Sequence, residues 1–161
     1  LVAMCIKVED LKRFNEKEFS NYFEKLKEEI KNTNDNFIIL NGKVNCGKTT
    51  IATKLVDNAS YMENIKTLYF SLETSKSTIT KMIREDSNYL TIYDRPITIE
   101  DIISKIKEKE PKFVVIDYLQ LIGFDKSKCL SRNKELELIK EDLKKLAKEL
   151  NIKIVVTSIC R

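Results

Sequence analysis

The sequence predicts an α/β fold in which a mainly parallel five-stranded sheet has helices on both faces. Five short apolar segments alternate along the chain with segments of helical periodicity, the pattern of a sheet built from strand–helix–strand units. Each apolar segment is too uniformly hydrophobic to have a solvent-exposed face, as expected for parallel strands covered on both sides. A length of 161 residues is enough for one domain with a substantial core.

The first predicted element is an amphipathic helix from Glu16 to Lys31. Its apolar residues recur at helical spacing: Phe19, Tyr22, Phe23, Leu26 and Ile30. This apolar stripe could pack on the domain's own core or on a neighbouring subunit, and its own core is the favoured interpretation. A turn-rich break over 32–36 separates this helix from the first strand.

The strands are predicted from continuous apolar or β-branched runs. They cover residues 37–40, 67–73, 89–93, 113–117 and 153–158. The remaining helices are expected over residues 49–58, 75–84, 98–110 and 134–150. Thr98 and Asp101 resemble a capping box, and Pro111 stops the helix that they begin. Residues 125–133 are polar and are expected to form an irregular loop.

Composition excludes several classes of protein. The chain has no histidine, which excludes a zinc site or a histidine-based triad, and its four cysteines lack metal-ligand spacing. The cysteines are far apart in sequence and are expected to be reduced thiols, which indicates a cytoplasmic protein. The absence of an 18-residue apolar run predicts that the chain neither spans a membrane nor has a membrane as its partner. The net charge of +4 comes from 29 basic and 25 acidic residues mixed along the chain, which is weak support for nucleic-acid binding.

A phosphate-binding motif lies between the first strand and the helix after it. Residues 42–49 fit G-x-x-x-x-G-K-[ST], in which two glycines allow a tight turn and backbone N–H groups face an anion at a helix N-terminus. Lys48 is expected to reach the β- and γ-phosphates, and the Thr49 hydroxyl to ligate Mg²⁺. The predicted nucleotide-binding residues are Gly42, Lys43, Val44, Asn45, Cys46, Gly47, Lys48, Thr49 and Thr50. The alternative is an ordinary glycine turn between a strand and a helix.

Cys46 lies within this motif, beside Lys48 and the start of the helix. This position predicts the most reactive of the four thiols, with protection by bound nucleotide. An inert buried thiol is the alternative.

Two carboxylates follow strands and complete the predicted site. Asp117 ends the strand over 113–117, at the carboxyl edge of the sheet, where it could hold Mg²⁺ together with Thr49. Glu73 ends another strand at the same edge and could deprotonate a water molecule. A turn or helix cap is the alternative for Asp117, and a role as the first acid after a strand is the alternative for Glu73.

Several segments resemble the DnaB-type replicative DNA helicases, which belong to the RecA-like P-loop ATPases. Residues 70–75 (F-S-L-E-T-S), 115–121 (V-I-D-Y-L-Q-L) and 143–152 (L-K-K-L-A-K-E-L-N-I) are similar to motifs of that family, and Arg132 and Glu135 resemble its R-x-x-E approach to the last helix. The resemblance implies a RecA-like P-loop NTPase fold with sheet order 3-2-4-5-1, strands being numbered in chain order. It also implies ATP and Mg²⁺ as cofactors, with Glu73 and Lys48 as catalytic residues.

The same resemblance implies that hydrolysis drives unwinding or translocation on single-stranded DNA by a homo-oligomeric, hexameric ring in the cytoplasm. It divides the chain into an N-terminal helical segment, 1–36, and an ATPase core, 37–161, that lacks the C-terminal part of the family domain. The family's DNA loops and arginine finger are expected beyond Arg161, which matches the arginine of the S-Q-L-N-R motif. This chain alone is therefore expected to hydrolyse ATP weakly, and its sheet to have an open edge beside the phosphate-loop strand.

Ser158 departs from the family pattern. It takes the place of the glutamine of S-Q-L-N-R that senses the γ-phosphate, so Ser158 marks the predicted sensor position. Two alternatives therefore stay open. One is a RecA-superfamily ATPase of recombination or signalling, and the other is a nucleotide-binding interaction module without turnover.

Overall fold

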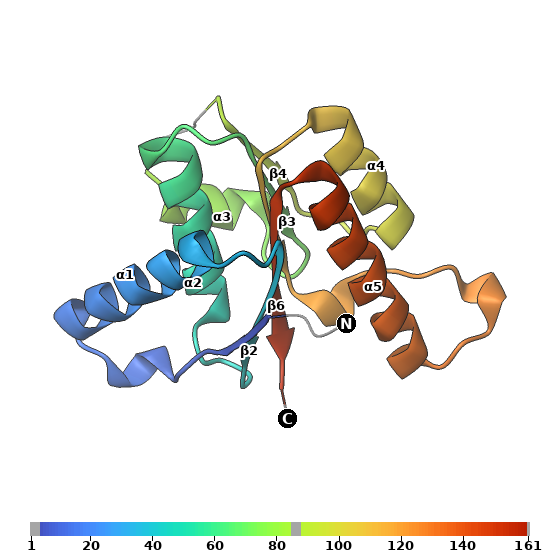
Figure 1. Cartoon of the computed structure of the whole chain (residues 1–161). Coiled ribbons are helices and arrows are strands. Elements are labelled where there is room, and N and C mark those ends of the chain that lie inside the picture. Colours follow the sequence, from blue (N-terminus) through green and yellow to red (C-terminus); the bar gives the residue numbers. More distant parts are fainter. Residues whose placement is uncertain (1–3, 85–87, 161) are drawn as a thin grey trace.

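The computed structural model describes residues 4–84 and 88–160 and contains a six-stranded parallel sheet (Figure 1). The strands are β1 (Met4–Lys7), β2 (Phe37–Gly42), β3 (Thr67–Ser71), β4 (Leu90–Tyr93), β5 (Phe113–Asp117) and β6 (Lys153–Ile159). Their order across the sheet is β1-β2-β6-β5-β3-β4, and every neighbouring pair is parallel. The predicted α/β fold class is confirmed.

The five predicted strands keep their predicted order, but the predicted strand count was wrong. β1 pairs with β2 over its full length, from Met4 opposite Ile38 to Lys7 opposite Asn41, and so adds a sixth strand. The N-terminal segment is therefore not only helical, and the edge beside the phosphate-loop strand is not open. Four residues with alternating exposure are too short a pattern to identify as a strand before their partner strand is known. Residues 1–3 of the expected N-terminal segment lie outside the described residues.

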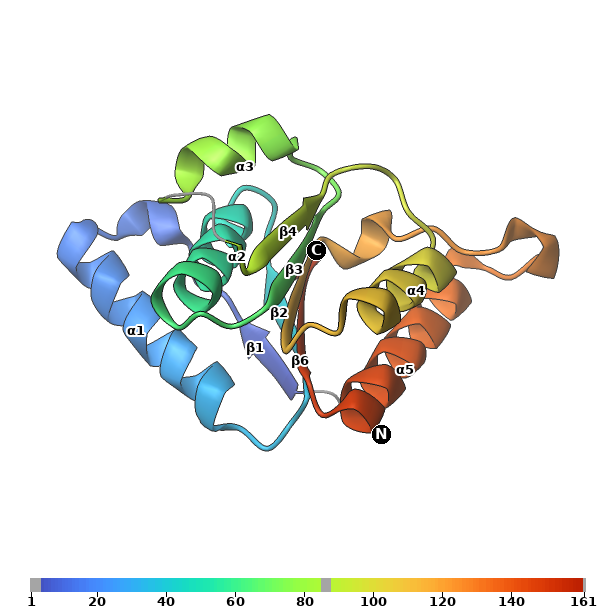
Figure 2. The same ribbon diagram turned by 90° about the horizontal axis from the view of Figure 1, so that it is seen from above.

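Five α-helices of the described ranges lie on the two faces of this sheet (Figures 1 and 2). They are α1 (Glu16–Asn32), α2 (Lys48–Asp57), α3 (Lys76–Met82), α4 (Ile99–Lys109) and α5 (Arg132–Leu150). Short helical turns occupy Leu11–Arg13 (η1), Asn58–Met62 (η2), Leu119–Leu121 (η3) and Lys126–Lys128 (η4). Helix α5 begins two residues earlier than predicted because the Ser131 side chain caps it by accepting from the Lys134 N–H.

Strand β2 divides the core into two layers. Successive side chains of a strand point to opposite faces, so Ile38 and Leu40 join one buried cluster while Phe37 and Ile39 join the other. The first cluster includes residues of α1, α2 and α3, and the second includes residues of α4 and α5. The apolar stripe of α1 thus packs on the chain's own core, which confirms the favoured interpretation.

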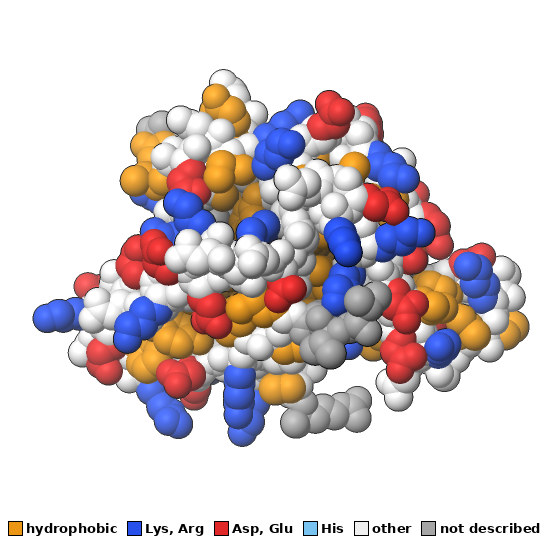
Figure 3. Space-filling view, viewed as in Figure 1, with side chains coloured by type: hydrophobic (Ala, Val, Ile, Leu, Met, Phe, Trp, Pro, Cys, Tyr) orange, Lys and Arg blue, Asp and Glu red, His pale blue; other side chains and the backbone are white. Residues whose placement is uncertain are grey.

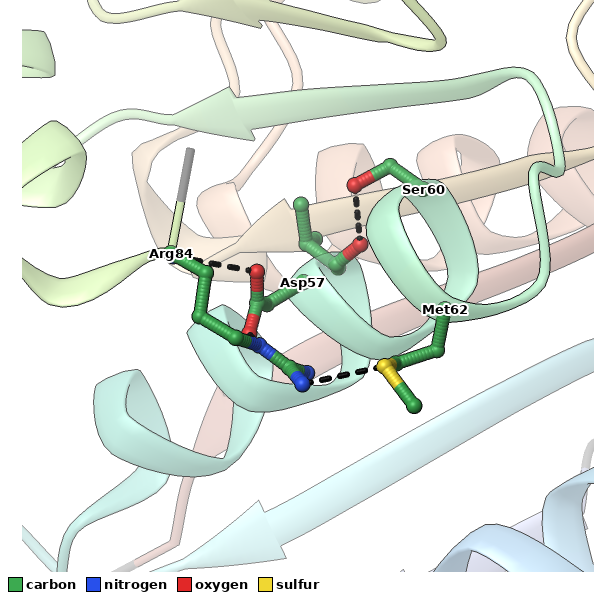
Figure 4. A network of polar contacts seen from close by, with 5 residues as sticks. Asp57, Ser60, Met62 and Arg84 are labelled. Atoms are coloured by element: carbon green, nitrogen blue, oxygen red, sulfur yellow. Dashed lines mark hydrogen bonds and ion pairs between the residues drawn. The ribbon is translucent and has the colours of Figure 1, made fainter. Parts of the chain in front are cut away.

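A polar contact joins the end of α2 to the segment after α3 (Figure 4). Arg84 Nε donates to Asp57 Oδ2 at 2.8 Å, and the Arg84 backbone N–H donates to Asp57 Oδ1 at 3.3 Å. The same guanidinium contacts Met62 Sδ at 3.0 Å and lies 4.9 Å from the centroid of the Tyr61 ring. A half-exposed ion pair contributes only about 0–1 kcal/mol, so this contact mainly fixes where α3 lies against η2.

The packing of α1 gives a stability prediction. Leu26 is 3% exposed in the first cluster, so Leu26→Ala should lower the free energy of unfolding by about 2–5 kcal/mol through lost burial and a cavity. Lys25→Ala, one residue away on the exposed side of the helix, should change it by less than about 0.5 kcal/mol. Urea denaturation followed by circular dichroism measures both, and equal effects would mean that α1 does not pack as described.

Candidate functional site

The phosphate loop needs glycine at both ends for reasons of space and backbone conformation. Gly47 has φ +102°, in the left-handed region, and a Cβ there would lie 2.8 Å from Leu11 Cδ1. A Cβ at Gly42 would lie 2.5 Å from Cys46 Sγ and 3.2 Å from the Lys48 side chain. The two glycines therefore let the loop fold tightly against its own side chains and against the N-terminal segment.

The start of α2 differs from the starts of the other α-helices in the described ranges. Four of them begin with a side chain that accepts a backbone hydrogen bond: Asn15, Ser75, Thr98 and Ser131. Helix α2 has Gly47 at its N-cap position and therefore no side-chain cap. The first N–H groups of a helix have no partner within it, and here they stay available to an anion.

Lys48 lies inside the loop, and its side chain is 7% exposed. Its Nζ donates to the carbonyl groups of Gly42 at 3.0 Å and Lys43 at 2.7 Å. These two residues of the predicted set thus hold the ammonium through their backbone. This position places a positive charge beside the uncapped helix start.

Asp117 joins three elements through its carboxylate, which is buried (1% exposed). Thr49 Oγ1 at the start of α2 donates to Oδ2 at 2.8 Å, and Thr157 Oγ1 of β6 donates to Oδ1 at 2.6 Å. The predicted metal ligands Thr49 and Asp117 therefore lie together, whereas sequence analysis missed Thr157. The only sequence indication of Thr157 was a polar residue near the end of an apolar strand.

Tyr69 of β3 is a buried neighbour of this carboxylate. Burial raises the pKa of its hydroxyl, and the negative charge of Asp117 raises it further. The phenol therefore stays neutral, with Thr53 Oγ1 3.5 Å from its oxygen.

Glu73 lies just past the end of β3, which runs beside β5 with Ser71 opposite Asp117. Ser71 Oγ donates to the Thr74 carbonyl at 2.6 Å and closes the turn that carries Glu73. The Leu72 N–H donates to the Asp117 carbonyl at 2.9 Å, which joins this turn to the end of β5. The Glu73 side chain is exposed and lines the same cavity as the phosphate loop.

This cavity has a volume of about 640 Å³. Of the predicted residues, Val44 to Thr50, Glu73 and Asp117 line it. Sequence analysis missed part of its wall, which consists of Leu11, Lys12, Phe19 and Lys54. The Leu11 N–H donates to the Cys46 carbonyl at 3.0 Å, so the segment after β1 lies directly on the loop.

Ser158 does not line the cavity, and it is 6% exposed. Its Oγ accepts a hydrogen bond from Gln120 Nε2 at 3.0 Å, and the Gln120 amide also bonds the backbone of Ile159. Arg132 in turn donates to the carbonyl groups of Gln120 and Ile122 and pairs with Glu135 at 3.0 Å. Gln120 thus links the predicted sensor position to the start of α5, a connection that sequence analysis missed. Arg161 lies outside the described residues.

The structure corrects the expectation for Cys46. Its thiol is 4% exposed beneath the loop, 3.8 Å from Lys48 Nζ, whereas Cys5 and Cys129 are exposed. Reagents reach exposed thiols first, so the buried-thiol alternative fits better.

The donor set fits a hard cation bound together with phosphate. The Thr49 hydroxyl and the Asp117 carboxylate meet at the predicted metal position, and Mg²⁺ is commonly bound by one or two protein oxygens plus phosphate groups. Within the described residues, no cluster of three or more cysteine, aspartate or glutamate side chains could hold a metal on its own. None of the described helices is long and apolar enough to cross a membrane.

Residues 79–161, which are 83 of the 161, match the family described as DnaB-like helicase C terminal domain. A probable replicative DNA helicase of Guillardia theta is 31% identical, over 75% of this chain and 26% of its own length. The replicative DNA helicase DnaB of Mycoplasma pneumoniae is 40% identical, over 38% of this chain and 14% of its own. The chain therefore spans about a quarter or less of these two relatives.

Solved structures support the fold. A DnaB-like replicative helicase, solved in a study of its interactions with primase, superposes with a TM-score of 0.66 at 24% identity, over 78% of this chain and 39% of that one. A KaiC-like protein of Pyrococcus horikoshii gives a TM-score of 0.60 at 15% identity, over 78% of this chain and 62% of that one. At these identities the likeness is one of fold, and the fold is the RecA-like one.

The geometry at Asp117 gives a second prediction. Thr157→Val keeps the side-chain shape but removes the donor to Oδ1, so it should lower the free energy of unfolding by about 1–3 kcal/mol. Thr53→Val is the matched control, because it removes only a 3.5 Å contact between neutral groups in the same core. Thermal and urea denaturation compare the two, and an equal or smaller loss for Thr157→Val would contradict the proposed importance of this bond.

Proposed function

The chain belongs to the DnaB-like helicase C-terminal domain family, and we propose that it binds and hydrolyses ATP to drive movement along single-stranded DNA. The observation that carries the proposal is the meeting of an uncapped helix start, a buried lysine and a Thr49–Asp117 pair in one cavity. Each of these features suits one part of a magnesium nucleoside triphosphate.

The residues have distinct roles in binding. The N–H groups at the start of α2 and the Lys48 ammonium hold the β- and γ-phosphates. Thr49 and Asp117 hold Mg²⁺, which when bound neutralises charge on the phosphate oxygens. Leu11, Lys12 and Phe19 bound the same cavity on the side of the N-terminal segment.

Glu73 acts as the general base in the proposed reaction. Its carboxylate takes a proton from a water molecule while the water oxygen bonds to the γ-phosphorus. The bond from the γ-phosphorus to the bridging oxygen breaks, ADP leaves with that electron pair, and inorganic phosphate forms. The exposed position of Glu73 in the cavity wall allows this role, because its carboxylate is free to approach a water molecule.

We propose that the chain couples ATP hydrolysis to movement on DNA as one subunit of a homo-oligomeric ring, in keeping with its membership of a helicase family. Ser158, Gln120 and Arg132 form a continuous hydrogen-bonded path from the end of β6 to the start of α5. The Gln120 amide also bonds the backbone of Ile159, which lines the cavity, so we assign this path the task of transmitting the nucleotide state.

A second candidate function is nucleotide binding without turnover. It is favoured by one observation: Ser158 is buried and bonded to Gln120, outside the cavity lining. Such a module would bind ATP through the same loop and would not respond to DNA.

Removal of the loop lysine tests nucleotide binding. Lys48→Ala should weaken binding of a fluorescent ATP analogue by about 10- to 100-fold or more, because a charge-assisted contact to phosphate is lost. The control is Lys107→Ala, on the exposed face of α4, which also removes one positive charge but does so outside the loop. This variant should bind the ATP analogue with the affinity of the parent chain. Equal affinities for all three proteins would show that the loop is not the binding site.

The catalytic role of Glu73 is tested separately from binding. Glu73→Gln keeps the side-chain shape but cannot take a proton, so ATP affinity should persist while hydrolysis falls by about 10²- to 10⁴-fold. Glu141→Gln on the exposed side of α5 serves as the control. Single-turnover hydrolysis of γ-labelled ATP, with and without single-stranded DNA, measures the effect. Binding without turnover in the parent chain, whether or not DNA is present, would favour the interaction module.

A further inference from the structure

A second cavity of about 500 Å³ lies at the opposite edge of the sheet, where the strands begin. Its floor is apolar and comes from three elements, with Ile30 of α1, Leu55 of α2 and Phe113 of β5. Its rim carries five lysines: Lys27, Lys31, Lys66, Lys112 and Lys153. None of these residues belongs to the phosphate-loop site, which lies where the strands end.

The charge of this rim is unbalanced. One acidic residue, Glu63, lines the cavity against the five lysines, a net charge of +4, which equals the formal net charge of the whole chain. Lys31 Nζ pairs with Glu63 at 3.4 Å, and Lys27 Nζ pairs with Glu24 at 2.9 Å outside the lining. The remaining positive charge is concentrated on the three lysines at the strand starts.

These three lysines are held in a row by the backbone. The Lys112 N–H donates to the Lys66 carbonyl at 2.9 Å, and the Lys153 N–H donates to the Lys112 carbonyl at 3.2 Å. They therefore stand at the starts of β3, β5 and β6, which are adjacent strands about 4.8 Å apart. Neighbouring like charges repel one another, and an anion bound among them would offset that repulsion.

Lys153 is the most enclosed of the row. Its Nζ donates to the carbonyl groups of Thr33 at 2.6 Å and Asp35 at 3.2 Å. Burial lowers the pKa of this ammonium, and the Asp35 carboxylate acts in the opposite direction. The row thus includes a cation that is partly removed from water, where attraction to an anion is stronger than at an open surface.

We propose that this cavity binds an amphipathic organic anion, with its apolar body on the floor and its anionic head at Lys66, Lys112 and Lys153. The volume lies within the range of small-molecule sites, roughly 300–1,000 Å³, and such sites combine an apolar lining with a few placed polar groups. Figure 3 shows Lys and Arg side chains around hydrophobic ones above α1, on the side where β6 begins. The site is independent of the ATP site, because the two lie at opposite edges of the sheet.

The shape of the positive charge favours a small ligand over a nucleic acid. A duplex or single strand needs a stripe of cations that follows successive phosphates, and a single strand also needs a series of aromatic side chains on which its bases stack. Here the cations instead surround one compact apolar floor. An acidic protein segment would satisfy the charges as well, so it enters the test as a competing outcome.

The test uses two matched fluorescent probes on the intact chain with saturating ATP–Mg²⁺ present. The first probe, anilinonaphthalene sulfonate, is anionic, and the second, phenylnaphthylamine, is its neutral counterpart. Lys66→Gln/Lys112→Gln should weaken the anionic probe on the order of tenfold, about 1.4 kcal/mol, and leave the neutral probe unchanged. The control, Lys107→Gln/Lys148→Gln, removes two exposed charges from α4 and α5 and should bind both probes as the parent does.

Location is read from amide chemical-shift changes in NMR spectra of the parent chain. Changes on adding the anionic probe should concentrate at Ile30, Ala59, Ile65 and Phe113. Equal probe affinity in the two double variants, or shift changes confined to the phosphate loop, would overturn the proposal. Displacement of the probe by an acidic amphipathic peptide but not by a long-chain fatty acid would also overturn it and would assign the cavity to a protein partner.

Discussion

The Asp117 carboxylate is the group on which the site geometry depends most. It is buried, and a buried carboxylate is costly unless donors satisfy it, so the two threonine hydroxyl groups that it accepts from are structural requirements. Those donors come from α2 and β6, so one side chain fixes the start of the phosphate-loop helix relative to two neighbouring strands. The same arrangement keeps oxygen atoms together at the edge of the sheet where a cation and phosphates are expected.

The N-terminal segment has two structural roles that a separate appendage would not have. Strand β1 covers the edge of β2, which would otherwise present unpaired backbone groups. The residues after β1 then lie across the phosphate loop, where Leu11 contacts Gly47 and bonds the Cys46 carbonyl. Because the strand determines where that segment begins, sheet pairing and the shape of the nucleotide cavity are coupled.

The two edges of the sheet carry different electrostatics for the same geometric reason. Parallel strands bring all their starts to one edge and all their ends to the other. At the ends, Asp117 and Glu73 face the positive start of α2, which suits a magnesium nucleotide. At the starts, the lysines that precede or open β3, β5 and β6 meet over an apolar floor. Residues far apart in sequence thus become neighbours through strand order alone.

The sequence by itself determined the layer architecture, five of the strands and the phosphate loop, because these depend on local periodicity and on a short motif whose spacing reflects backbone geometry. The order of those five strands was expected only from the family resemblance, and the sheet confirms it. The sequence also identified Thr49 and Asp117 as partners, since one lies at the start of the helix after the phosphate loop and the other at the end of a strand, and both positions can be read from local patterns. Only the tertiary structure decided the rest. The pairing of β1, the Thr157 bond, the Gln120–Ser158 contact and the burial of Cys46 each depend on residues distant in the chain, and no local pattern specifies which distant segments meet.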